Sequence, residues 1–284
     1  MRLNYRETDV ALRRIAYFTI FACMGLCAIT STTVAAETEP VPVILDTDMG
    51  NDIDDVFAMG VLHAVHSRAE CRIVAVTVSK DHPLSAPFCD VLNNFFGRPN
   101  IPVGVLRTGK SSGDEPYLPQ VMRRLPDGSP TFPHSLQKSS DAPLAVPILR
   151  KGLAGLRDGS AVVIAIGPLT SIRDVLESAP DEQSTLDGKA LVAAKVRTFV
   201  IMAGDFSKPK AEFNIFSDSE AASSVFTHWP TELVTCPFEM GEWVHYPEMS
   251  LENDFRVPDP HPLLVANLAT FGGKRNDSEH PSKP

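Results

Sequence analysis

The chain has 284 residues, of which 43% are hydrophobic and 21% are charged, enough for one globular domain with a sizeable core. Its 35 acidic residues outnumber its 26 basic residues, and the formal net charge is −9. Because an acidic surface repels phosphate backbones, nucleic acid is excluded as an expected partner.

The first 36 residues are typical of a signal peptide. Arg13 and Arg14 precede an apolar stretch at residues 15–29, and a small-residue cleavage pattern ends at Ala36. This stretch is short for a membrane span, and no other stretch of about 18 apolar residues follows it. We therefore expect export to the periplasm or the medium without stable membrane insertion, and a mature domain at residues 37–284.

Short apolar, β-branched runs recur along the mature chain and predict six strands. Each run is nearly continuous rather than alternating, which is typical of strands buried on both faces of a parallel sheet. The predicted strands lie at residues 43–45, 73–78, 101–105, 161–166, 196–203 and 233–236. Predicted helices lie between them at residues 54–68, 87–96, 144–156, 169–177 and 219–227. This alternation predicts an α/β fold with a doubly wound, mostly parallel sheet.

Residues 111–147 interrupt the alternation. The stretch is rich in Pro, Ser, Asp and Gly, which predicts an irregular excursion. Excursions of this length are often lids over functional sites, but an inert surface loop fits the composition equally well.

Several polar segments directly follow predicted strands. In open α/β sheets the ligand binds beyond the carboxyl ends of the strands. We therefore expect these sequence-distant segments to surround one pocket. They lie at residues 46–55, 80–82, 167–170 and 204–214.

The segment at residues 46–55 contains five aspartates. One or two acidic residues commonly cap a helix N-terminus, but capping uses only the first turn, so five exceed that need. Clustered carboxylates repel one another unless a cation neutralises them. Oxygen ligands of this kind suit Ca²⁺ or Mg²⁺ and not zinc or copper. The five are Asp46, Asp48, Asp52, Asp54 and Asp55.

Two other aspartate motifs compete with this interpretation. An EF-hand loop starting at Asp46 would need glycine at its sixth position and glutamate at its twelfth, where Asn51 and Phe57 stand, so that loop is excluded. Phosphatases of the haloacid dehalogenase type also place an Asp-x-Asp pair after their first strand. They usually carry Thr or Val two residues later, where this chain has Gly50. The phosphatase stays an alternative that phosphoester turnover would test.

Three motifs, in this order and spacing, resemble the inosine-uridine-preferring nucleoside hydrolase family over nearly all of the mature chain. They are DTDMGNDIDD at residues 46–55, similar to the family's N-terminal aspartate motif with two extra residues, GPLT at 167–170, and EFNI at 212–215 followed by DSEAA at 218–222. The resemblance implies a nucleoside hydrolase-like fold. It also implies hydrolysis of the N-glycosidic bond of ribonucleosides to ribose and free base.

The resemblance further implies a calcium site. Asp48 and Asp55 match carboxylate ligands of the ion, and Thr170 matches a ligand that acts through its backbone carbonyl. All three are hard oxygen donors, as Ca²⁺ requires. In the family the ion also holds the ribose hydroxyls and the attacking water, and Asp48 matches the general base that activates this water.

Other matching positions imply a sugar site for a small-molecule ribonucleoside. Asp54 matches a ribose contact, Asn214 a contact to a ring hydroxyl and Glu212 a contact to the 5′-hydroxyl. Asp81 stands at the sugar site where many members have an asparagine, and Asp46 is expected to organise the loop. Without the resemblance, Glu212 and Asn214 would fit an ordinary polar loop before a helix. Assembly into a homo-oligomer is left open.

Some features depart from the family. Phe206 stands where members often have an asparagine, and no histidine matches the residue that protonates the leaving base. Members continue beyond the position of Pro284 and supply a further aspartate that binds calcium and ribose. Asp254, Asp259 and Asp277 have no matching context. We therefore expect impaired activity or, alternatively, a non-catalytic relative that keeps the fold and metal or riboside binding.

Overall fold

The computed structural model describes residues 39–109, 116–244, 246–247, 250, 253–255 and 260–272. The described strands and helices belong to the compact unit that begins at Pro40. The signal peptide expected at residues 1–36 lies outside the described residues, so it stays a prediction.

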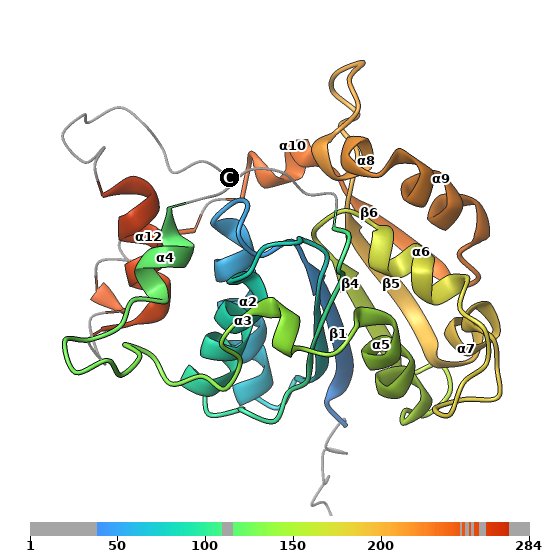
Figure 1. Ribbon diagram of the computed structural model, residues 1–284. Helices are drawn as coiled ribbons and strands as arrows, with labels where there is room; N and C mark the ends of the chain where they lie inside the picture. Colours follow the sequence, from blue (N-terminus) through green and yellow to red (C-terminus); the bar gives the residue numbers. More distant parts are fainter. Residues whose placement is uncertain are drawn as a thin grey trace, which may run out of the picture. The chain divides into compact units, whose positions relative to one another are not determined.

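Within the described residues, six parallel strands form one sheet (Figure 1). Across the sheet the order is β3-β2-β1-β4-β5-β6, and every neighbouring pair is parallel. The sheet thus extends outward from β1 to β3 and then restarts at β4 on the other side of β1. This topology confirms the predicted doubly wound α/β fold. In chain order the strands are β1 (Val41–Thr47), β2 (Cys71–Val78), β3 (Val103–Val105), β4 (Ala161–Ala165), β5 (Val196–Met202) and β6 (Glu232–Cys236).

Helices cover both faces of the sheet (Figure 1). One face carries α2 (Asp54–Ser67), α3 (Ser85–Phe95), α4 (Tyr117–Val121) and α12 (Pro262–Phe271). The other face carries α5 (Ala145–Ala154), α6 (Thr170–Leu176), α7 (Gly188–Lys195) and α9 (Ser219–His228). Shorter pieces are the 3-10 turn η1 (Ser139–Asp141), α8 (Phe213–Ser217) and α10 (Phe238–Gly241).

The sequence predicted α2, α3, α5, α6 and α9 to within about two residues at each end, as is usual for helix boundaries. It did not predict α4, α7, α8, α10 or α12. Three of these, α4, α8 and α10, have only four or five residues, too few to display a helical period.

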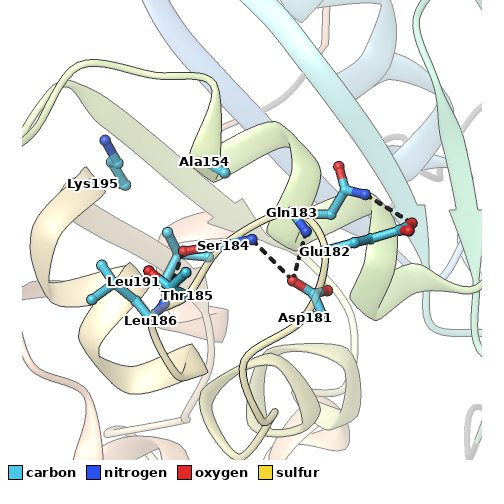
Figure 2. A pocket seen from close by; sticks show the side chains of 9 residues that line it. All are labelled: Ala154, Asp181, Glu182, Gln183, Ser184, Thr185, Leu186, Leu191 and Lys195. Carbon is cyan, nitrogen blue, oxygen red and sulfur yellow. Dashed lines mark hydrogen bonds between the residues drawn. The ribbon is translucent and has the colours of Figure 1, made fainter.

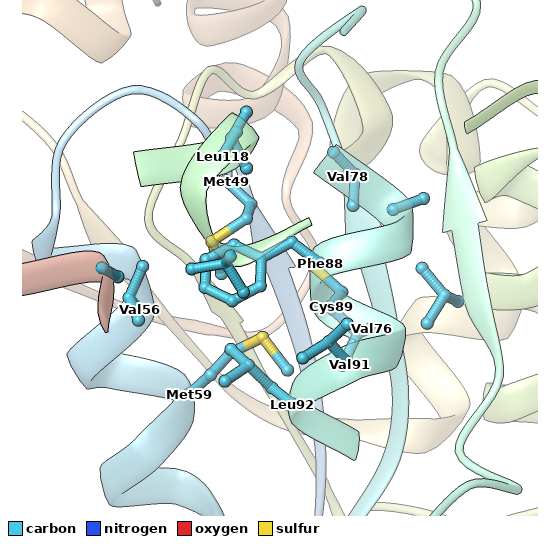
Figure 3. Close-up of a cluster of buried hydrophobic side chains, with 14 of the residues drawn as sticks. Met49, Val56, Met59, Val76, Val78, Phe88, Cys89, Val91, Leu92 and Leu118 are labelled. Atoms are coloured by element: carbon cyan, nitrogen blue, oxygen red, sulfur yellow. The ribbon is translucent and has the colours of Figure 1, made fainter. Parts of the chain in front are cut away.

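Neighbouring residues of β1 enter different cores. Leu45 packs with α2, α3 and α4, in the cluster around Phe88 that Figure 3 shows, whereas Ile44 packs with α5, α6 and α9 on the opposite face. Successive side chains of a strand point to opposite faces, so a strand covered on both sides must be apolar throughout. This double burial explains why the strand runs are continuous in the sequence.

Candidate active site at the carboxyl edge of the sheet

The aspartate loop, residues 46–55, lies where the strand order reverses. It leaves β1 between β2 and β4, and the register pairs Thr47 with Val78 on one side and Asp46 with Ala165 on the other. The carboxyl ends of these three strands therefore meet around the loop. Such a switch point is the usual ligand site of doubly wound sheets.

The turn after β4 touches the aspartate loop closely. A Cβ atom at Gly167 would lie 2.8 Å from Cβ of Asp48 and 2.9 Å from its backbone nitrogen. On the other side, the Ser79 hydroxyl donates to the carbonyl of Thr47 at 3.2 Å. The predicted convergence of the segments after β1, β2 and β4 is thus present, and it depends on a residue without a side chain at position 167.

Asp48 and Asp55 form a buried carboxyl pair. Their exposed fractions are 4% and 3%. Asp55 accepts a hydrogen bond from the Thr47 hydroxyl, and Asp48 accepts one from the Asn51 amide at 2.6 Å. Burial, the charges of Asp48 and Asp54, and a hydrogen bond with Asp48 raise the pKa of Asp55 well above its usual range. The two carboxyl groups are therefore close enough to share a proton or a cation.

Asp46 lies fully buried beneath this pair. Its Oδ1 atom accepts a hydrogen bond from the Thr77 hydroxyl at 2.5 Å. Its Oδ2 atom is buried and makes no hydrogen bond of good geometry with the described residues. Burial raises the pKa of Asp46 to about 7, although hydrogen bonding from Thr77 and Ser171 opposes the shift and the charge of Asp48 adds to it. The Thr77 bond links β1 to β2 at the base of the aspartate loop. This contact is consistent with the expected role of Asp46 in organising the loop.

Asp54 and Asp81 lie on the solvent side of the cluster. Asp54 is the first residue of α2 and is exposed, yet partial burial of its carboxyl and the charges of Asp52 and Asp48 raise its pKa to about 6. Asp81, just after β2, is exposed as well. Both are open to a ligand from solvent, but no described contact joins Asp81 to the buried pair.

Glu212 and Asn214, after β5, are both buried and both anchor the local structure. Glu212 caps α8: its carboxylate accepts from the backbone N–H groups of Asn214 at 2.7 Å and Gly204 at 3.3 Å. The Asn214 amide donates to the carbonyls of Ile166 at 3.1 Å and Met202 at 3.2 Å, the ends of β4 and β5. These contacts place the segment at the predicted edge and give both residues a structural role there.

Thr170 opens α6 and links it to α9. Its hydroxyl donates to Asp218 at 2.7 Å, and Asp218 caps α9 through the N–H of Ala221 at 3.2 Å. Arg173 lies 3.7 Å from the same carboxylate. Asp218 belongs to the DSEAA motif of the sequence, but only the fold brings it into contact with Thr170.

Tyr117 is a contributor that the sequence did not identify. It belongs to α4 in the excursion at 111–147, it is fully buried, and its hydroxyl accepts from the Gly50 N–H at 2.7 Å and donates to the Asp52 carbonyl at 3.2 Å. The described part of the excursion therefore packs on the aspartate loop and supports its shape. Nothing in the local composition distinguished this tyrosine from a surface residue.

The sequence placed Lys80 and Asn51 in segments around the predicted pocket but assigned neither residue a role. Lys80 is only 2% exposed, and its ammonium group donates to Oδ1 of Asn51 at 2.6 Å. Asn51 in turn holds Asp48. The available signal was positional, since Lys80 begins the polar segment 80–82 that follows the second predicted strand.

The donor set fits a hard divalent cation only in part. Asp48 and Asp55 supply two adjacent buried carboxylates, the ligand chemistry that Ca²⁺ prefers. Among the described residues, no group of three or more His, Cys, Asp and Glu side chains is arranged to hold a metal ion. Further ligands would therefore be carbonyl oxygens or water, as the expected role of the Thr170 carbonyl requires.

A groove lies away from the aspartate loop. A groove of about 400 Å³ is bounded by Ala154 at the end of α5, Lys195 at the end of α7 and the loop between α6 and α7, including Asp181 and Ser184 (Figure 2). Those helix ends precede β4 and β5, so the groove lies toward the amino edge of the sheet, away from the aspartates.

No helix in the described ranges is long and apolar enough to cross a bilayer.

Comparison with known proteins decides the family. Residues 43–280 match the sequence profile described as inosine-uridine preferring nucleoside hydrolase. The chain belongs to this family. Among curated relatives, a pyrimidine-specific ribonucleoside hydrolase, RihA, of Klebsiella pneumoniae is 29% identical over 81% of this chain and 71% of its own length. An uncharacterized protein of Schizosaccharomyces pombe is 28% identical over 72% of this chain and 63% of its own length.

Solved structures of nucleoside hydrolases have the same fold as this chain. A plant nucleoside hydrolase, PpNRh1, superposes with a TM-score of 0.58 and 25% identity, covering 84% of this chain and 73% of its own. An inosine-uridine preferring nucleoside hydrolase of Bacillus anthracis has a TM-score of 0.53 and 18% identity, with coverage of 86% and 88%. The family and fold expected from the three motifs are therefore confirmed.

Proposed function

We propose that this nucleoside hydrolase family member cleaves the N-glycosidic bond of ribonucleosides to ribose and free base. The observation that carries the proposal is the buried Asp48–Asp55 pair at the switch point, in contact with the Gly167 turn. Family membership supports this reaction class. The matched regions span 63% of the Schizosaccharomyces pombe protein and 71% of RihA, so both relatives extend beyond the region of similarity.

The proposed mechanism assigns a proton transfer to Asp48. Water attacks C1′ of the ribose, and the Asp48 carboxylate accepts a proton of that water. The bond from C1′ to the base nitrogen breaks with its electron pair on the base, which then takes a proton from solvent. The glycosidic transition state resembles an oxocarbenium ion, which nearby carboxylates stabilise. Asp54 is the proposed ribose contact on the solvent side, and the Asn51 amide keeps the Asp48 carboxylate oriented.

We further propose that Asp48, Asp55 and the Thr170 carbonyl hold Ca²⁺. When bound, the ion would supply Lewis acidity for the attacking water and a template for the ribose hydroxyls. The two carboxylates and the hardness of the oxygen donors support this choice. Glu212, Asn214 and Asp81 complete the proposed sugar site, in addition to the structural contacts that Glu212 and Asn214 make.

A second candidate is a non-catalytic relative that keeps the fold and binds metal or ribosides without turnover. One observation favours it: both oxygens of the Glu212 carboxylate accept backbone N–H groups, Oε1 from Asn214 and Oε2 from Gly204 and Ile215. A carboxylate committed to helix capping has less capacity for a substrate hydroxyl.

Release of reducing sugar tests the proposal. The chain is incubated with uridine, cytidine, inosine and adenosine, with calcium or with a chelator, beside a general phosphatase substrate. We expect ribose release that calcium supports and Asp48→Asn abolishes, with no phosphoester turnover. The matched control is Asp187→Asn, at the cap of α7 away from the site. Riboside binding without ribose release would establish the non-catalytic alternative, and phosphatase turnover lost in Asp46→Asn would establish the phosphatase.

We also propose that the chain is exported. The basic residues, apolar stretch and cleavage pattern within residues 1–36 support this location. Cell fractionation and N-terminal sequencing of the processed protein test it. A mature N-terminus near Glu37 in the exported fraction is expected, and an unprocessed cytoplasmic chain would reject the proposal.

A further inference from the structure

Lys80 is a buried cation beside the aspartate loop. The residue is 2% exposed, and it directly follows Ser79 at the carboxyl end of β2. Lysines are almost never fully buried unless they are paired, because removing an ammonium group from water is costly. The burial of Lys80 beside the aspartate loop therefore requires a physical reason.

A short chain of hydrogen bonds joins Lys80 to the proposed general base. The Lys80 ammonium donates to Oδ1 of Asn51 at 2.6 Å, and Nδ2 of the same amide donates to Oδ2 of Asp48 at 2.6 Å. The amide group thus separates a positive group from a negative one. Hydrogen bonds to charged groups are stronger than neutral ones, and this arrangement polarises both.

The surrounding backbone fixes the position of Lys80. A Cβ atom at Gly50 would lie 3.4 Å from Cδ of Lys80, so the lysine stem runs along the aspartate loop. On the other side, a Cβ at Gly109 would lie 2.1 Å from the Ser79 carbonyl oxygen and 2.5 Å from the Asp81 nitrogen. The turn that carries Lys80 therefore packs closely on Gly109, while the lysine stem lies against Gly50.

We propose that Lys80 is the resident counter-charge of the aspartate loop: it stabilises the cation-free protein and lowers the affinity of Asp48 and Asp55 for a divalent cation. The carboxylates of the loop repel one another, and a fixed ammonium nearby offsets part of that repulsion. The same ammonium repels an incoming divalent cation, and burial leaves little salt screening between them. The inference rests on the cation site of the proposed function.

Calcium titration of three variants tests the inference. Lys80→Met removes the charge and keeps an unbranched stem, and Lys80→Arg keeps the charge. Lys195→Met is the matched control, because its ammonium pairs with Asp158 at 2.7 Å at the other edge of the sheet and its loss changes net charge equally. Isothermal titration with calcium chloride and thermal unfolding with and without a chelator are measured on each.

We expect Lys80→Met to bind calcium with a dissociation constant lower by about tenfold, the direction given by removal of a nearby like charge. It should also unfold at a lower temperature in chelator and gain more from calcium than the wild type. Lys80→Arg and Lys195→Met should match the wild type in the change that calcium produces. If Lys80→Met is unfolded in chelator, recovery of its fold in calcium supports the inference.

Calcium affinity in Lys80→Met that equals or falls below that of the wild type would overturn the inference, as would failure of calcium to restore an unfolded Lys80→Met. Absence of calcium binding in both proteins would overturn it too, because the loop would then have no cation affinity for Lys80 to reduce. Failure of the proposed hydrolysis is measured separately, as ribose release by the wild type, and it does not alter the titration result.

Discussion

A methyl group at position 167 should disturb the proposed active site more than its size suggests. In Gly167→Ala the new Cβ would lie 2.8 Å from Cβ of Asp48, 2.9 Å from its nitrogen and 2.8 Å from the Ser79 hydroxyl. Carbon atoms normally approach to about 3.5–4.0 Å, so the turn and the aspartate loop must separate by about an ångström. Two of the three obstacles are backbone or Cβ atoms, which cannot rotate away.

The expected cost follows from this displacement. Overpacking of a well-packed interior typically destabilises by about 1–3 kcal/mol. Moving a catalytic group by about an ångström can reduce the rate by about a hundredfold. We therefore expect Gly167→Ala to lower the free energy of unfolding by about 1–3 kcal/mol. The variant should keep its secondary structure but release ribose at a small fraction of the wild-type rate.

Urea unfolding, calcium titration and ribose release measure the three consequences. Gly155→Ala is the matched control: the glycine ends α5, and a Cβ there would meet nothing closer than the Lys151 carbonyl at 3.7 Å. Its stability and activity should stay near those of the wild type. If Gly167→Ala had the stability and calcium affinity of the Gly155→Ala control, the proposed contact between the turn and the loop would be refuted.

Three further changes test the site and its support. Asp48→Asn should abolish calcium binding in isothermal titration, whereas undiminished binding would remove Asp48 from the ligand set. Tyr117→Phe should lower the urea midpoint, with a loss of about 1–3 kcal/mol, because the buried Gly50 N–H loses its acceptor at 2.7 Å; an unchanged midpoint would argue against that anchor. His63 is a buried residue of α2, and burial and the charge of Arg98 lower its pKa from 6.5 to about 4. Below pH 6.5 the unfolded chain binds a proton at this histidine more readily than the folded chain does. The free energy of unfolding therefore falls as the pH drops from 6.5 to about 4. Over that interval the wild type should lose up to about 3 kcal/mol more than His63→Gln, and parallel pH profiles would exclude this role.

The sequence by itself determined the fold class and predicted where the candidate site lies. Continuous apolar runs required strands covered on both faces, and the observed sheet buries Ile44 and Leu45 in different cores. Aspartates clustered directly after the first strand could lie only at the carboxyl edge of a parallel sheet. Both conclusions depend on local periodicity and chain order, which a sequence states directly.

Only the tertiary structure decided which side chains meet. The contact of Gly167 with Asp48, the support of the loop by Tyr117 and the approach of Lys80 join segments at least 29 residues apart. Such contacts are set by strand order and register, and local patterns carry no information about them. The same reason explains Glu212 and Asn214. Their place at the site edge was predicted from motifs, whereas their bonds to α8 and to the ends of β4 and β5 emerged only when distant strands were brought together.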